Sequence, residues 1–164
     1  MLMGVAGTGK TTVGKLLASE LGWEFRDADD YHSRTNVEKM RNGIPLTDAD
    51  REPWLEALRA LICDWVGQKT NAVLACSALK AVYRETLRVG PEVQFVYLKV
   101  AEEMLHQRLR ARHGHYMTEQ MLASQLAALE EPQSALVVNG DGAPQEIVEA
   151  VQARLRLTKF TQPE

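Results

Sequence analysis

Apolar positions along the chain alternate between short continuous runs and stretches with helical spacing. Residues 72–76 are apolar without a break, as in a parallel strand covered on both faces. After Lys10, by contrast, Val13, Leu17 and Leu21 recur every three or four positions, and Gly22 follows as a C-terminal cap. The spacing predicts helices over residues 10–21, 36–42, 47–65, 80–89, 102–112, 119–130 and 144–157, and strands over residues 1–3, 23–26, 72–76, 93–98 and 136–138.

Strand and helix therefore alternate along the whole chain. This order predicts an α/β fold of three layers, a five-stranded parallel sheet with right-handed crossovers and helices on both faces. No repeat or linker interrupts it, so residues 1–164 are expected to form a single domain. Only Met1-Leu2-Met3 precede the first loop, so the first strand is either clipped or unusually short. Pro53 falls inside a helical pattern and predicts a kink or a new helix start.

The composition narrows the class of protein without naming a ligand. The 164 residues are 45% hydrophobic and 25% charged, which is typical of a soluble globular domain. A formal charge of −3 with scattered basic residues predicts neither nucleic acid nor membrane as a partner. The two cysteines lack CxxC spacing, and no signal-peptide pattern opens the chain, so we expect a cytoplasmic location.

A glycine-rich loop, residues 4–11, follows the first apolar residues and fits the pattern G-x-x-x-x-G-K-[ST]. Its glycines let backbone N–H groups point into one anion-binding nest at a helix N-terminus. Lys10 is placed to reach the β- and γ-phosphates, and the Thr11 hydroxyl to bind Mg²⁺. A turn that matches by chance is the alternative. The pattern favours a nucleoside triphosphate site made by Gly4, Val5, Ala6, Gly7, Thr8, Gly9, Lys10, Thr11 and Thr12.

Two carboxylates, Asp27 and Asp29, come at the end of the second predicted strand. Ligands of open α/β sheets gather at the carboxyl ends of the strands, so both acids are expected beside the phosphate loop. If the segment stays extended, the two side chains share one face. One could then hold Mg²⁺ while the other accepts a proton from a substrate hydroxyl. The alternative is an ordinary Asp-rich turn.

The helix over residues 102–112 carries three arginines near its end. Arg108 and Arg112 are four residues apart and can face one ligand, whereas Arg110 points away as a surface charge. Cationic side chains stabilise the negative charge that phosphoryl transfer spreads over the transferred group. An exposed basic helix face is the alternative. Gly114 is expected to be the hinge of a lid over residues 113–132.

Further polar residues have no part in triphosphate binding. Lys80 and Arg84 are one helical turn apart after the central strand, well placed to hold a carboxylate or hydroxyls. A structural salt bridge is the alternative for Arg51. A lone histidine is more often structural than functional, but the closeness of His32 to Asp29 makes the two readings even. Trp54 is expected in the core.

These residues occur within longer segments that resemble one family, the gluconate kinases of the small P-loop type, related to shikimate kinase and the nucleoside monophosphate kinases. The Cys-Ser-Ala-Leu-Lys and Asp-Arg-x-Pro-Trp-Leu segments are the most specific, and the likeness runs from Gly4 to about Leu157. The similar segments are residues 4–11, 27–32, 36–40, 43–46, 48–51, 53–55, 76–80, 83–84, 114–116 and 125–132.

The resemblance implies ATP-dependent, Mg²⁺-assisted phosphorylation of D-gluconate at its 6-hydroxyl by a cytoplasmic homodimer. It implies that Asp29 orients and deprotonates that hydroxyl, that Asp27 serves the metal with Thr11, and that Lys10 and Arg112 act on the phosphates. The residues implied for gluconate binding are Asp29, His32, Arg51, Lys80, Arg84 and His115.

For the nucleotide base, the resemblance implies that Arg108 stacks on adenine and that the turn of Gly142, Ala143 and Pro144 lines it. One departure concerns the metal. Cys76-Ser77 stands where many P-loop proteins carry a Mg²⁺-holding acid, so the metal role of Asp27 is an inference rather than a motif match.

Two other readings stay open. The first keeps the fold and changes the acceptor to shikimate, a nucleoside monophosphate or another polyol acid. The second is a nucleotide-dependent switch without a small acceptor. A GTPase is expected to carry [NT]-K-x-D, which does not occur in the sequence.

Overall fold

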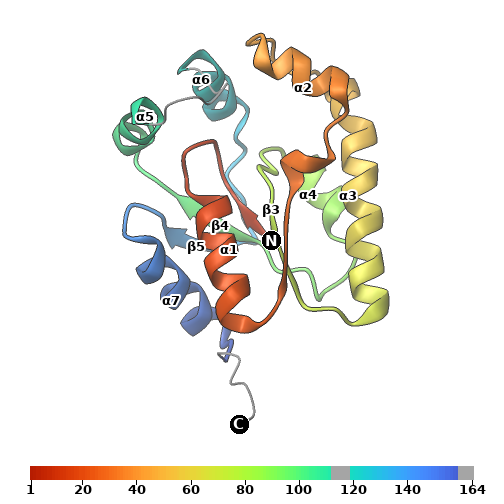
Figure 1. Cartoon of the computed structure of the whole chain (residues 1–164), viewed down its shortest axis with the longest axis vertical. Coiled ribbons are helices and arrows are strands. Elements are labelled where there is room, and N and C mark those ends of the chain that lie inside the picture. Colours follow the sequence, from red (N-terminus) through yellow and green to blue (C-terminus); the bar gives the residue numbers. More distant parts are fainter. Residues whose placement is uncertain (112–118, 159–164) are drawn as a thin grey trace.

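Five strands form the central sheet of the computed structural model, which describes residues 1–111 and 119–158 (Figure 1). Their order across the sheet is β2-β3-β1-β4-β5, and the four pairings between neighbours are parallel. The predicted α/β class with a five-stranded parallel sheet is confirmed. The strands are β1 Leu2–Met3, β2 Glu24–Asp27, β3 Ala72–Ala75, β4 Val96–Lys99 and β5 Leu136–Asn139.

Helices connect the strands and end close to the predicted positions. No helix in residues 1–111 and 119–158 combines the length and the apolar character needed to cross a membrane. The helices are α1 Lys10–Leu21, α2 Arg34–Arg41, α3 Asp48–Gln68, α4 Ala81–Leu87, α5 Glu102–Arg110, α6 Glu119–Ala128 and α7 Pro144–Leu155, with a 3₁₀ turn, η1, at Ala28–Tyr31.

The central strand β1 is only two residues long, yet it pairs with β3 on one side and β4 on the other. Leu2 and Met3 are almost wholly buried. Backbone bonds outside the strand extend its pairing, from the Val96 N–H to the Met1 carbonyl at 2.8 Å and from the Gly4 N–H to the Ser77 carbonyl at 3.3 Å. The glycine-rich loop therefore leaves from the middle of the sheet.

Alternate strand residues face opposite layers, as the two-residue period of a strand requires. On one face Leu2, Val73 and Leu98 pack with α1 and α7. On the other face Met3 and Leu74 pack with α3 and α4. Both faces of the inner strands are therefore covered, which explains their continuous apolar runs (Figure 1).

Helix α3 begins with a capping box at Thr47 and is continuous through its proline. The Thr47 hydroxyl accepts from the Asp50 N–H at 3.1 Å, and the Asp50 carboxylate accepts from the Thr47 N–H at 2.9 Å. The helix continues through Pro53 to Gln68, so the expectation of a new helix start there is wrong. The first turn of α3 lies at the carboxyl end of the sheet, where Arg51 lines a cavity.

A third apolar cluster lies beyond the carboxyl ends of the strands. Leu105 and Leu109 of α5 and Leu122 of α6 pack there against Val5 of the glycine-rich loop and Leu79. Leu105 and Leu122 are almost fully buried. Helices α5 and α6 are thereby fixed next to the loop, above the edge where ligands of parallel sheets collect (Figure 1).

Candidate active site

One cavity of ≈ 380 Å³ lies at the carboxyl end of the sheet. Its lining comes from the glycine-rich loop, η1, the start of α3, the segment after β3, and α6. A volume of this size suits a small polar ligand beside a phosphate tail. The predicted site residues that line it are Ala6, Gly7, Gly9, Lys10, Thr11, Asp27, Asp29, His32, Arg51 and Lys80.

The glycine-rich loop has the backbone of an anion nest. Gly4, Gly7 and Gly9 all have positive φ, at 142°, 86° and 91°, a region that side chains disfavour. A Cβ on Gly4 would also lie 3.0 Å from the Leu98 carbonyl oxygen. Lys10 begins α1, and its Nζ donates to the Val5 carbonyl at 2.9 Å, folding the side chain back over the loop. The loop and the helix N-terminus together provide a phosphate-binding cradle.

The other predicted loop residues do not present their side chains to the cavity. Val5 is buried in the apolar cluster with α5 and α6. The buried Thr8 hydroxyl donates to the Val5 carbonyl at 2.9 Å, so it locks the loop from inside. Gly4, Val5, Thr8 and Thr12 are not among the residues that line the cavity, and Thr12 is exposed on α1.

The Thr11 hydroxyl and the Asp27 carboxylate form a pair that fits a magnesium ion. Thr11 Oγ1 donates to Asp27 Oδ2 at 2.7 Å. Adjacent ligands of an octahedral Mg²⁺ at ~2.1 Å are about 3 Å apart, so the two oxygens are spaced as neighbouring ligands. The thiol of Cys76, at the position where many P-loop proteins carry an acid, is buried, and burial raises its pKa to about 12. Asp27 is therefore the better placed ligand.

Asp27 and Asp29 come together through a turn rather than along an extended strand. The chain does not stay extended, because η1 begins directly after β2. Asp27 caps this turn, and its Oδ1 accepts from the Asp29 N–H at 3.1 Å. The condition for a shared strand face, an extended segment, is therefore not met, and both residues nevertheless line the cavity. The turn, rather than strand alternation, presents both acids.

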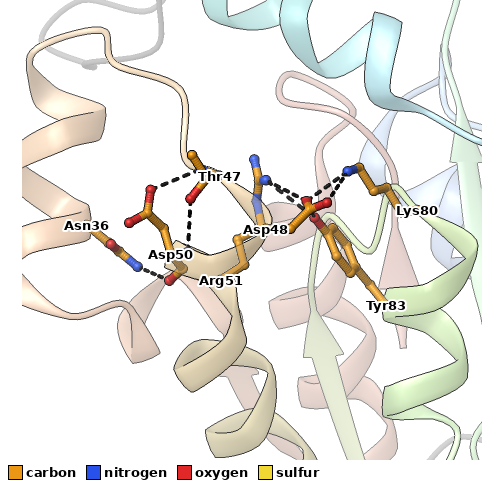
Figure 2. Close-up of polar contacts among 7 residues, drawn as sticks. All are labelled: Asn36, Thr47, Asp48, Asp50, Arg51, Lys80 and Tyr83. Carbon is orange, nitrogen blue, oxygen red and sulfur yellow. Dashed lines mark hydrogen bonds and ion pairs between the residues drawn. The ribbon is translucent and has the colours of Figure 1, made fainter.

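Arg51, Lys80 and Tyr83 converge on one carboxylate, that of Asp48 (Figure 2). Lys80 Nζ lies 2.7 Å from Oδ1 and 2.8 Å from Oδ2, and the Tyr83 hydroxyl donates to Oδ1. Arg51 Nη1 lies 3.6 Å from Oδ1 and donates to the Tyr83 hydroxyl at 3.3 Å. These donors lower the pKa of Asp48, and the Asp48 carboxylate raises the pKa of Lys80. Arg51 thus does form the salt bridge that was the alternative, and it also lines the cavity.

The next acid along α3, Asp50, belongs to a separate group (Figure 2). Its carboxylate accepts from Lys39 Nζ at 2.7 Å, and its carbonyl accepts from Asn36 Nδ2 at 2.6 Å. The Lys39 bond, with those from Thr47, lowers the pKa of Asp50 to about 2. This group ties α2 to the start of α3 and is not part of the cavity lining.

His32 stacks on Trp54, with ring centroids 4.7 Å apart and planes at 9°. Trp54 donates from Nε1 to the Ala28 carbonyl at 2.7 Å, belongs to the core as predicted, and also lines the cavity. Burial, with the nearby Arg51 charge as a second cause, lowers the pKa of His32 to about 4. The imidazole is therefore neutral at physiological pH and can offer one donor and one acceptor.

This pKa shift predicts a pH dependence of stability. The folded pKa of about 4 lies below the ordinary value of 6.5, so the unfolded state binds the proton first as the pH falls. The contribution of neutral His32 is complete above pH 6.5 and is lost as the pH falls toward 4. His32→Phe keeps an aromatic ring on Trp54 but cannot titrate. Thermal melts from pH 7 to 4.5 should show the wild type losing more than the variant, and parallel losses would contradict the prediction.

Arg84 lies away from the predicted acceptor site. Its side chain is buried, and Nη1 donates to the carbonyls of Ala78 and Leu79 at 2.9 and 2.8 Å. Ala78 has a positive φ of 43°, which is strained for a non-glycine residue. Arg84 is absent from the cavity lining. Its bonds stabilise the turn at Ala78 and Leu79, which directly precedes Lys80.

Arg108 connects the glycine-rich loop to the segment between β5 and α7. Its guanidinium donates to the carbonyls of Gly7 at 3.3 Å, Gly140 at 2.9 Å and Asp141 at 3.1 Å. The turn predicted to line adenine, with Gly142 and Pro144, follows directly at the start of α7 and is not part of the cavity lining. The predictions for Arg112, Gly114 and His115 lie outside the described residues.

Among the side chains at or beside the cavity that sequence reasoning missed are Asp48, Tyr83 and Gln125. Asp48 and Tyr83 could have been found from spacing, since each is three residues from a predicted cation, Arg51 and Lys80 respectively. Gln125 of α6 lines the cavity, and its Oε1 accepts from the Ala6 N–H at 2.7 Å. No local pattern indicates that contact.

Comparisons with known proteins show the family of this chain. The shikimate kinase family model matches residues 6–156. A gluconokinase of Gluconobacter oxydans (strain 621H) is 46% identical over 158 residues, covering 91% of this chain and 86% of that protein. A gluconokinase structure from Sinorhizobium meliloti 1021 has a TM-score of 0.82 and 38% identity, covering 94% of this chain and 90% of that one.

A second solved structure is a sugar kinase from Janibacter sp. HTCC2649 in an unliganded form. It has a TM-score of 0.88 and 40% identity, and the match covers 95% of this chain and 92% of that one. The family match spans most of the chain, and the identities with gluconokinases extend over most of both sequences. This chain therefore belongs to the shikimate kinase family of P-loop kinases and, within it, to the gluconokinases.

Proposed function

We propose that this protein phosphorylates D-gluconate at its 6-hydroxyl with ATP, giving 6-phospho-D-gluconate and ADP. The observation that carries the proposal is the single cavity in which the phosphate loop, the Asp29 carboxylate and the cations Arg51 and Lys80 meet. A kinase needs these parts in one place: a phosphate cradle, an acid for the hydroxyl and a grip on the acceptor.

The phosphate loop holds the triphosphate through its N–H groups, and Lys10 neutralises charge on the β- and γ-phosphates. Arg108 is held by its edges on three carbonyls, and a guanidinium held in this way can stack an aromatic base on its face. Adenine then lies between Arg108 and the Gly142–Pro144 turn. This arrangement points the γ-phosphate at the acceptor cavity.

Mg²⁺ would be held by Thr11 and Asp27 together with phosphate oxygens, and it would supply positive charge to the transferred group. The two protein oxygens have the spacing that this role needs. Loss of the Asp27 carboxylate would therefore remove the only carboxylate ligand that we assign to the ion.

Asp29 accepts the proton of the 6-hydroxyl as that oxygen attacks the γ-phosphorus. Its backbone N–H is fixed on Asp27, so η1 sets its position relative to the phosphate loop. Arg51 and Lys80 bind the other end of the sugar acid, and neutral His32 adds hydrogen bonds to hydroxyls between them. Positioning of this kind accounts for most of the catalysis in phosphoryl transfer.

A coupled assay of ADP release tests the proposal. Purified protein with Mg-ATP should turn over gluconate well above a control without acceptor. Shikimate, a nucleoside monophosphate and neutral glucitol at equal concentration form the comparison panel, since the family model is named for shikimate kinase. No turnover of gluconate by folded protein would reject the function, and faster turnover of another acceptor would reassign it.

The remaining expectations belong to the same proposal. Residues 113–132 act as a lid that excludes water, with Arg112 reaching the phosphates and His115 the acceptor. The protein works in the cytoplasm as a homodimer, which light scattering on a sizing column would test.

A further inference from the structure

The three donors that surround Asp48 face the cavity, whereas Asp48 itself does not line it. Arg51, Lys80 and Tyr83 are among the lining residues. The Asp48 side chain is 63% exposed, against 27% for Arg51 and 30% for Lys80. In Figure 2 the carboxylate reaches from the first turn of α3 into the space between Arg51 and the Lys80–Tyr83 pair. The donors thus belong to the site, and their present acceptor comes from outside it.

This donor set has the chemistry of a carboxylate receptor. An ammonium at 2.7 and 2.8 Å, a phenolic hydroxyl and a guanidinium at 3.6 Å surround one anionic group. Charge-assisted bonds of this kind are the strong ones in recognition of carboxylates. With Asp48 in place the group carries one net positive charge, and without it two. When Asp48 leaves, the three donors and the second positive charge are therefore available to bind another carboxylate.

We propose that Arg51, Lys80 and Tyr83 form the subsite for the acceptor's carboxylate, and that Asp48 is a resident carboxylate which the acceptor displaces. The proposal rests on the proposed function only in that the acceptor is a sugar acid. It adds Tyr83 as a third donor and gives Asp48 the role of an internal competitor.

Displacement is physically easy at this position. An exposed ion pair contributes little net stability, because water solvates both partners well when they separate. Asp48 is the first residue of α3, so its charge stays favourable near the helix N-terminus even after the side chain rotates into solvent. The bonds that cap the helix come from Thr47 and Asp50, so they are unaffected.

An internal competitor also makes the site selective. A neutral polyol offers no charge to replace Asp48, so it leaves the subsite closed. A sugar acid supplies an equivalent carboxylate and gains further bonds through its hydroxyls. The apparent affinity of the protein for the sugar acid equals the intrinsic affinity multiplied by the fraction of molecules in which Asp48 has left the subsite.

Asp48→Asn tests the proposal, because it keeps the shape of the side chain and removes its charge. If Asp48 occupies the subsite in most molecules, the KM for gluconate should fall by roughly 3- to 10-fold, since apparent affinity scales with the open fraction. The KM for ATP should not follow. Asp50→Asn is the matched control: it removes an acid from the same helical turn, but one that pairs with Lys39 outside the cavity, so the KM for gluconate should stay near the wild-type value.

Calorimetric titration of gluconate into each protein separates this inference from the proposed function. Tighter binding to the Asp48 variant without any turnover would reject the reaction and support the subsite. An unchanged or weaker affinity in Asp48→Asn, with the control normal, would show that Asp48 does not compete, and would overturn the inference even if gluconate is phosphorylated. Binding to neither protein would reject both. Asp48→Ser replaces Asp48→Asn if the first variant does not fold.

Discussion

Asp29→Asn should lower kcat by roughly 10²- to 10⁴-fold, the usual contribution of a positioned general base. The amide has nearly the shape of the carboxylate but cannot accept the proton of the acceptor hydroxyl. The fold of the site should persist, because the substitution keeps the Asp29 backbone N–H, which donates to Asp27 Oδ1 in η1. Steady-state kinetics with gluconate and Mg-ATP, together with a thermal melt, measure both effects.

Asp30→Asn is the matched control for this change. Asp30 is the neighbouring acid in the same 3₁₀ turn, and we assign it no part in the reaction. Its substitution should change kcat far less than that of Asp29. Equal losses in the two variants would indicate a general effect of charge in the turn, and a normal kcat in Asp29→Asn would remove the proposed base.

Lys10→Met is the second substitution with a large expected effect, a loss of about 10²- to 10³-fold in kcat/KM, comparable to removal of one preorganised donor at a reacting centre. Met keeps the length of the side chain and loses the charge that neutralises the phosphates. The bond from Nζ to the Val5 carbonyl is also lost, but the loop keeps its glycine geometry and the Thr8 bond.

Lys15→Met provides the control on the same helix. Lys15 is exposed on α1, with its Nζ 5.8 Å from the centroid of the Phe25 ring, and it does not line the cavity. Its loss should leave kcat/KM close to the wild-type value. A small effect of Lys10→Met, similar to that of Lys15→Met, would contradict the role assigned to Lys10 in phosphate binding.

Local patterns were sufficient for the parts of the site that one segment builds by itself. The glycine-rich loop depends on φ values that only glycine adopts easily, so its conformation can be predicted from residues 4–11 alone. The capping box of Thr47 and Asp50 is likewise built from neighbouring residues. Strand alternation would bring Asp27 and Asp29 to one face only in an extended segment, and the chain forms a tight turn there instead.

Contacts between distant segments could not be predicted, because they depend on how the layers pack. Lys80 and Asp48 are 32 residues apart, and Ala6 and Gln125 are 119 apart. Arg84 shows the same limit, since helical spacing places it beside Lys80 but burial turns its guanidinium onto two backbone carbonyls.

The sequence by itself determined the parallel α/β sheet and the phosphate loop. It also indicated the acids and cations proposed to take part in phosphoryl transfer at the carboxyl end of the sheet. Periodicity reports which faces are buried, and glycine positions report backbone conformation, so both can be read from short segments. Only the tertiary structure decided which cation meets which anion, and so placed the Asp48 carboxylate among Arg51, Lys80 and Tyr83. That choice depends on the relative positions of α3, β3 and α4, which are fixed by packing of the core between them rather than by any one segment.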